Sequence, residues 1–208
     1  MKKTLLILSL LALMTACNKA PANNVAAANT AAPVNQTASA EPAQGAQPTG
    51  LPPGLDCVRN RLTPEQRRDV AQAAMEQASR DDPRAQALLQ AVDACGNESS
   101  WSPEKRRLAG AFSMSAAGAS ALREFLGGRG VNLDELDRLI LSDQELMAAA
   151  ESGELGSAGQ SFASRHEEAL NQIAGGREID QETGTRIGNY IAFRAAAEAF
   201  GGKFGREP

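Results

Sequence analysis

The chain has 208 residues and a formal charge of −4, and its 42% hydrophobic residues include only six Phe, one Trp and one Tyr. This length allows one folded domain once targeting segments are set aside. An acidic chain lacks the basic surface that neutralises phosphates, which excludes nucleic acid as a partner. Because much of the apolar content is alanine, we expect a thin core formed by helices that approach closely.

The first 17 residues have the pattern of an export signal. Lys2 and Lys3 give a basic start, and a short apolar run from Leu5 to Leu13 leads through small residues to Cys17. The apolar run is shorter than the roughly 20 residues that a transmembrane helix needs, so it indicates a signal that is removed. Removal of the two lysines changes the formal charge from −4 to −6.

The segment Met14-Thr15-Ala16-Cys17 resembles the lipobox of bacterial lipoproteins, although that family usually has Leu where this chain has Met14. The resemblance implies a signal peptide over 1–16 and acylation of Cys17, for example with palmitate, which anchors the chain to a membrane. Asn18 rather than Asp follows the cysteine, which implies the outer membrane, facing the periplasm, if the host is Gram-negative. The alternative is an ordinary secretory signal with an incidental cysteine.

Residues 17–53 are rich in Ala, Pro, Asn, Gln and Thr, and their only large apolar residues are Val25, Val34 and Leu51. Such a segment buries too little surface to offset its ordering entropy, so we expect a disordered tether. A flexible coil of this length has a root-mean-square reach of roughly 30 to 35 Å. A domain on such a tether can reach partners near the membrane.

Residues 54–208 show helical periodicity throughout, which predicts an all-α domain, a compact bundle of about six helices. Thr63, Asp82 and Ser102 each precede a proline, as a capping residue does at a helix start. The expected helices cover 64–80, 83–95 with a stop at Gly96, 103–126, 133–141, 160–174, and 181–200 with Asp180 as its cap.

Three details of this helical pattern remain open or depend on glycines. The chain from 133 to 152 either breaks at Ser142 or forms one continuous helix. Three glycines at 153, 156 and 159 predict an open connection before the helix at 160. Gly184 and Gly188 lie one turn apart and indicate either a packing notch or a weakly formed first turn.

Cys57 and Cys95 are the only thiols that remain once Cys17 is lipidated. Export would place them in an oxidising compartment, so we expect a disulfide that links the start of the domain to the end of its second expected helix. The alternative is two buried free cysteines that act as small apolar residues.

No residue pattern predicts a metal site, a cofactor or a catalytic motif. The single histidine, His166, has no spaced partner ligands and shares an apolar stripe with Phe162, Leu170 and Ile173, which favours a half-buried core histidine. There is neither the paired CxxC motif of zinc and redox sites nor the CxxCH motif of haem attachment.

Glu98-Ser99 and Glu151-Ser152 resemble the catalytic dipeptide of lysozyme-like transglycosylases. A lone Glu can act there as an acid when an apolar pocket keeps it protonated. The Gly-Leu-Met-Gln segment and the Tyr-Asn pair of that family are missing. A peptidoglycan-active enzyme is therefore the alternative to our main expectation, a non-enzymatic, membrane-tethered module that binds an envelope protein or polymer.

Basic residues cluster at two of the expected helix starts. If these starts lie side by side, the cations form one patch that could contact lipid head groups, envelope phosphates or an acidic protein. The alternative is a solvated face with local pairs to Glu65, Asp69 and Glu104. The seven cations are Arg59, Arg61, Arg67, Arg68, Lys105, Arg106 and Arg107.

Overall fold

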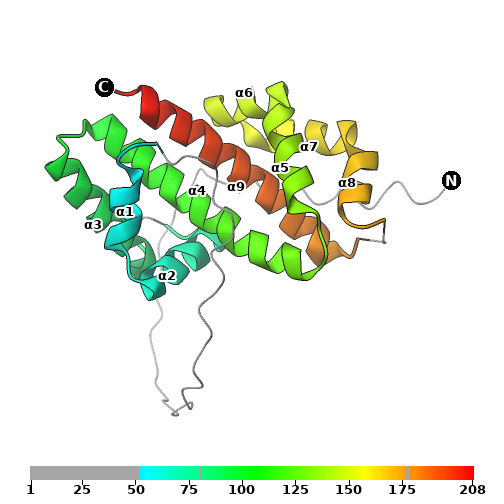
Figure 1. The fold of residues 1–208 in the computed structure, drawn as a ribbon, viewed down its shortest axis with the longest axis horizontal. Coiled ribbons are helices and arrows are strands. Elements are labelled where there is room, and N and C mark those ends of the chain that lie inside the picture. Colours follow the sequence, from blue (N-terminus) through cyan, green and yellow to red (C-terminus); the bar gives the residue numbers. More distant parts are fainter. Residues whose placement is uncertain (1–51, 80, 177–178) are drawn as a thin grey trace, which may run out of the picture.

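The computed structural model describes residues 52–79, 81–176 and 179–208 (Figure 1). These residues are 81% helical and contain no strand, which confirms the all-α prediction. The expected count of six helices is wrong, since the described part has nine. The predicted signal peptide, Cys17 and nearly all of the predicted tether lie outside these residues. The helices are α1 (Leu55–Arg61), α2 (Pro64–Met75), α3 (Pro83–Glu98), α4 (Pro103–Gly128), α5 (Leu133–Ser142), α6 (Gln144–Ser152), α7 (Leu155–Arg165), α8 (Glu167–Ile173) and α9 (Gln181–Arg206).

The two longest helices, α4 and α9, run antiparallel through the middle of the domain (Figure 1). Polar contacts join them at both ends. Ser102 Oγ donates to Glu207 Oε1 at 3.2 Å at one end, and Arg129 Nη1 lies 3.3 Å from Asp180 Oδ2 at the other. Helices α1–α3 flank one side of this pair and α5–α8 flank the other. The central pair is therefore the scaffold on which both groups of helices pack.

The buried apolar residues form two clusters, and α4 and α9 contribute to both. One cluster lies among α1–α3, the first half of α4 and the end of α9. The other lies among α5–α8, the second half of α4 and α9 as far as Ala199. The largest fully buried side chains are Tyr190 and Phe162 in the second cluster and Phe204 in the first.

Glycines allow α4 and α9 to approach closely. A Cβ atom at Gly118 of α4 would lie 2.9 Å from the ring of Phe193 on α9, and one at Gly201 of α9 would lie 3.2 Å from the ring of Phe112 on α4. Each helix thus accepts an aromatic ring from the other at a position without a side chain. The notch expected at Gly184 and Gly188 is not used for this contact, since a Cβ at Gly188 would have no neighbour within 4 Å.

Some helix ends differ from the prediction because of contacts that are remote in sequence. Helix α3 continues through Gly96 to Glu98, where we expected a stop, because the glycine makes room for a side chain: its Cβ would lie 2.7 Å from Arg106 Cζ. Helix α2 ends at Met75, five residues earlier than expected, and Gln77 follows with φ at 52°.

The second half of the chain is also divided more finely than expected. The break predicted at Ser142 falls one residue later, at Asp143, and separates α5 from α6. Helix α7 begins at Leu155 and not at 160, and His166 separates it from α8. Helix α9 starts at its predicted cap, Asp180, and continues to Arg206. Helix α1, with seven residues, is too short to give a clear periodicity in the sequence.

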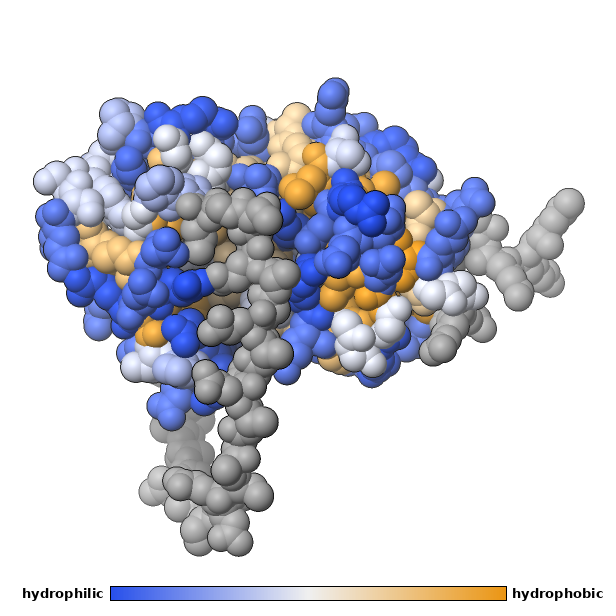
Figure 2. All heavy atoms as spheres, in the orientation of Figure 1, coloured by the Kyte–Doolittle hydropathy of each residue, from blue (hydrophilic) through white to orange (hydrophobic). Residues whose placement is uncertain are grey.

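The surface in Figure 2 is mainly hydrophilic, with apolar areas between the polar side chains. Among the described residues, Leu141 is the one large apolar residue that is exposed to solvent, with 41% of its surface accessible. Single exposed leucines are common on soluble domains and require no partner. None of the helices in the described ranges combines the length and apolar character needed to cross a bilayer.

The close contact between α4 and α9 can be tested with two glycines of α4. A Cβ at Gly110 would meet no atom within 4 Å, so Gly110→Ala should leave the free energy of unfolding unchanged or raise it by up to about 1 kcal/mol. Gly118→Ala should displace Phe193 and make the domain less stable than Gly110→Ala by about 1 to 3 kcal/mol. Urea denaturation measures both variants, and equal stabilities would show that the ring contact is unimportant.

Candidate functional site

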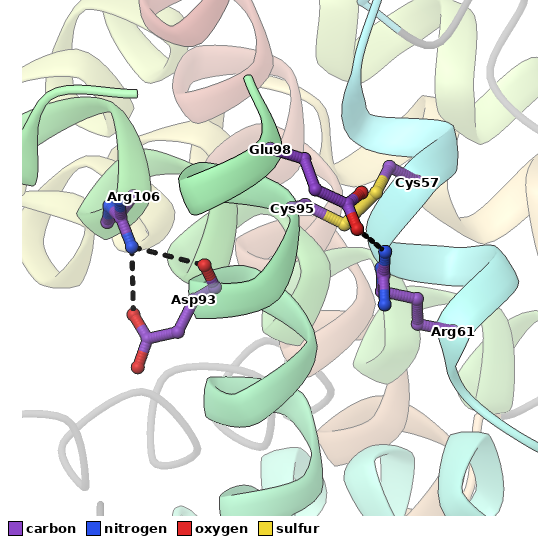
Figure 3. The surroundings of a disulfide bond; sticks show 6 residues. All are labelled: Cys57, Arg61, Asp93, Cys95, Glu98 and Arg106. Atoms are coloured by element: carbon purple, nitrogen blue, oxygen red, sulfur yellow. Dashed lines mark hydrogen bonds and ion pairs between the residues drawn. A yellow bond between two sulfur atoms is a disulfide. The ribbon is translucent and has the colours of Figure 1, made fainter. Parts of the chain in front are cut away.

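The predicted disulfide between Cys57 and Cys95 is present and joins α1 to the end of α3 (Figure 3). The two Cα atoms are 6.0 Å apart, a typical separation for a disulfide. Cys95 is fully buried, and Leu55 and Val58 of α1 are buried beside it in the same apolar cluster. The bridge therefore fastens α1, a helix too short to be stable alone, to the end of α3.

Charged side chains surround the bridge (Figure 3). Arg61 of α1 pairs with Glu98 of α3, so the two helices are linked by an ion pair as well as by sulfur. Arg106 of α4 donates to the backbone carbonyl of Asp93 at 3.1 Å and to Asn97 Oδ1 at 2.9 Å. Arg106 thereby holds α3 against the start of α4.

Helix α1 lies between the two helix starts at which the sequence places groups of cations. Gly54, just before α1, lies against Trp101 near the start of α4, with 3.2 Å between its Cβ position and Trp101 Cζ2. The start of α2 lies at the other end of α1 (Figure 1). The two starts lie at opposite ends of α1, and the single patch of seven cations stays a prediction.

Several of these cations make contacts within the fold. Lys105 Nζ donates to the carbonyl of Glu207 at 2.6 Å and lies 5.1 Å from the centre of the Phe204 ring. Arg107 pairs with Glu104, one of the local acidic partners that the sequence suggests. Arg67 Nη1 donates to the carbonyl of Leu62 at 3.2 Å.

Neither candidate catalytic glutamate lies in an apolar pocket. The side chain of Glu98 is 59% exposed and pairs with Arg61, and that of Glu151 is 52% exposed and lies 3.4 Å from Arg206 Nη2. A lone glycosidase acid needs an apolar pocket around its carboxyl group. Both side chains are instead more than half exposed to solvent, so the geometry provides no such pocket around either of them.

A polar cluster that the sequence analysis missed lies where α5–α6 meets α7–α8. The Asp143 carboxylate, only 6% exposed, accepts the Leu146 N–H at 2.8 Å and thereby caps α6. The same carboxylate accepts from Arg165 Nη2 at 2.9 Å and lies 2.8 Å from His166 Nε2. Burial disfavours ionisation of Asp143, but these hydrogen bonds outweigh it and hold its pKa at about 2.

His166 is half-buried, and its ring lies against Phe162 with the two centroids 4.7 Å apart. It occupies the junction between α7 and α8, so its contact with Asp143 joins two helix junctions. The cluster satisfies its own charges and hydrogen bonds. Its geometry therefore indicates that it holds α6 and α7 together.

A second polar network connects α4, α5 and α9. Tyr190 Oη donates to Asp137 Oδ1 at 2.7 Å, and Arg123 Nη1 donates to Tyr190 Oη at 3.0 Å and to Asp137 Oδ2 at 2.9 Å. Arg194, 8% exposed, lies 3.6 Å from the same carboxylate. Burial and the hydrogen bond to Asp137 raise the pKa of Tyr190. This network anchors α5 to the central pair.

Across residues 52–79, 81–176 and 179–208, no group of three or more His, Cys, Asp or Glu side chains is arranged to hold a metal ion. Of the Asp143 cluster, the sequence could have revealed only the capping position of Asp143, because Arg165 and His166 lie more than 20 residues away from it.

No protein-family model matches the chain, and no curated protein or solved structure matches it significantly.

The contribution of the disulfide can be measured with the double variant Cys57→Ser/Cys95→Ser. The bridge spans 38 residues, for which the entropy of loop closure predicts a loss of up to about 4 kcal/mol in the free energy of unfolding. Urea denaturation without reductant compares the variant with the wild type. Wild-type protein in reductant should match the variant, and a variant as stable as the oxidised wild type would contradict the expectation.

The Asp143 cluster predicts a specific loss of stability in acid. The folded-state pKa of Asp143 lies below its ordinary value near 3.8, so its ionised form stabilises the fold above about pH 4, and this contribution disappears as the pH falls towards 2. Asp143→Asn can still cap α6 but loses the ion contacts, and should lower the free energy of unfolding by about 1 to 3 kcal/mol at pH 7.

The measurement is urea denaturation of wild type and Asp143→Asn from pH 7 to pH 2. The difference in the free energy of unfolding between wild type and Asp143→Asn should become smaller below pH 4. Glu145→Gln is the matched control, because Glu145 also pairs with Arg165 but is 60% exposed, and it should change stability by less than about 1 kcal/mol. A difference between wild type and Asp143→Asn that does not change with pH would contradict the assignment.

Proposed function

We propose that this chain is a lipid-anchored, non-enzymatic binding module of the bacterial cell envelope, held at the outer membrane and facing the periplasm. In this proposal Cys17 carries the lipid, the residues up to 53 form the tether, and the helical domain binds an envelope protein or polymer. The disulfide supports export, because such bonds persist mainly in oxidising compartments.

The observation that carries the binding role is the distribution of charge. Residues 131–176, which contain α5–α8, have nine acidic residues and two arginines. All the other described residues together have fourteen acidic and fourteen basic residues. The excess negative charge of the domain is therefore concentrated on the side of the central pair opposite α1–α3. A field of this kind attracts positively charged partners and raises their association rate.

The entry point of the chain supports the same orientation. Pro52 lies near the end of α9, with 3.6 Å between its Cγ and the Cβ position of Gly201. The tether thus reaches the domain beside α1 and its disulfide. A membrane anchor attached there would leave much of the acidic α5–α8 side available to partners.

The anchor can be tested with Cys17→Ser. Without an acylated cysteine the short signal cannot hold the mature chain in a bilayer, so the variant should be either unprocessed or soluble. Detergent phase partitioning and the size of the mature chain give the result. A variant that is cleaved and still fractionates with membranes as the wild type does would contradict lipid anchoring.

The binding role can be tested by site-specific photocrosslinking in the native envelope. A photoreactive amino acid in place of Glu168 on α8 should give a discrete adduct, and Glu145→Lys/Glu167→Lys should reduce its yield at least several-fold. The same probe in place of Arg68 on α2 is the matched control. Strong adducts at Arg68 alone would instead favour the basic surface and an anionic partner.

Purified protein should also leave cell-wall sacculi intact in a zymogram. Lysis that disappears in Glu98→Gln or Glu151→Gln would overturn the non-enzymatic proposal and establish the transglycosylase alternative. Both substitutions preserve side-chain size, so loss of lysis would reflect loss of the acid group.

A further inference from the structure

We propose that the Cys57–Cys95 disulfide is the point at which a mechanical load on the tether passes into the folded domain. This inference rests on the proposed anchor, since only a chain fixed to the envelope and bound to a partner experiences tension between the two. The geometry that supports it is the short distance in sequence between the entry of the chain at Pro52 and Cys57.

The bridge gives tension a path that bypasses part of the domain. Force applied at Pro52 reaches Cys57 within the first turn of α1 and then crosses the sulfur bond to Cys95, near the end of α3. From Cys95 it passes through the short connection that begins at Ser99 into α4. Residues 58–94, which include α2 and most of α3, are outside this path and carry no tension while the bond is intact.

Without the bridge, the same force would act on weak contacts. Helix α1 has seven residues and is about 10 Å long, and its attachment depends on Leu55, Val58 and the neighbouring Leu62. The Arg61–Glu98 pair joins the same elements, but its side chains are 39% and 59% exposed. An exposed ion pair of this kind adds little to stability. These contacts would break one after another as α1 is pulled from the surface.

The position of Cys57 determines which contacts are protected. The contacts of Pro52 with Gly201 and of Gly54 with Trp101 precede the cysteine, so tension can break them. The buried residues Val58 and Val70 follow it and are shielded. The bridge thus preserves the packing of α2 on α4 even when the entry of the tether is pulled away.

Optical tweezers can test this force path. One handle is attached to the N-terminus of the mature chain and the other to a reactive amino acid in place of Gln144, an exposed residue at the start of α6. The oxidised wild type should show no separate early release of α1–α3. Cys57→Ser/Cys95→Ser should show an early step at lower force, and its fully extended length should exceed that of the wild type by about 13 nm.

A second pulling geometry separates this role from general stability. With handles at Gln144 and at the C-terminal Pro208, the disulfide lies outside the force path, so the two proteins should begin to unfold at similar forces. Two results would overturn the proposal. One is that the wild type and the double variant have equal first-step forces in the first geometry. The other is that loss of the disulfide lowers the first-step force equally in both geometries. The handles replace the lipid, so failure of Cys17 to be acylated would leave these measurements valid.

Discussion

The domain depends on the close approach of α4 and α9. A chain rich in alanine and poor in aromatic residues can bury enough apolar surface only if its helices lie close together. Gly118 and Gly201 permit this approach because each accepts a ring from the opposite helix, Phe193 in one case and Phe112 in the other. The remaining helices pack on the two sides of the scaffold that results, and the network of Tyr190, Asp137 and Arg123 attaches α5 to it.

The sequence contained enough information for the fold class, most helix starts and the disulfide. Thr63, Asp82, Ser102 and Asp180 each cap a helix as predicted, because a cap forms between residues at most three apart. The disulfide followed from the number of thiols and the expected compartment. These features depend on local chemistry or on counting, so a single sequence is sufficient to find them.

Features that depend on distant contacts could not be predicted. Gly96 looked like a helix end because a glycine that ends a helix and one that makes room for Arg106 have the same local pattern. The cluster around Asp143 was not predicted, since the pairing of Asp143 with Arg165 needs the packing of α6 against α7.

The two apolar clusters share the same pair of long helices, and this has a thermodynamic consequence. Met75 at the end of α2 packs against the second cluster while Val70 of the same helix belongs to the first. Loss of either cluster would leave α4 and α9 exposed along half their length and weaken the other. We therefore expect the oxidised domain to unfold cooperatively in the absence of load, in one transition, although its helices are divided into two groups.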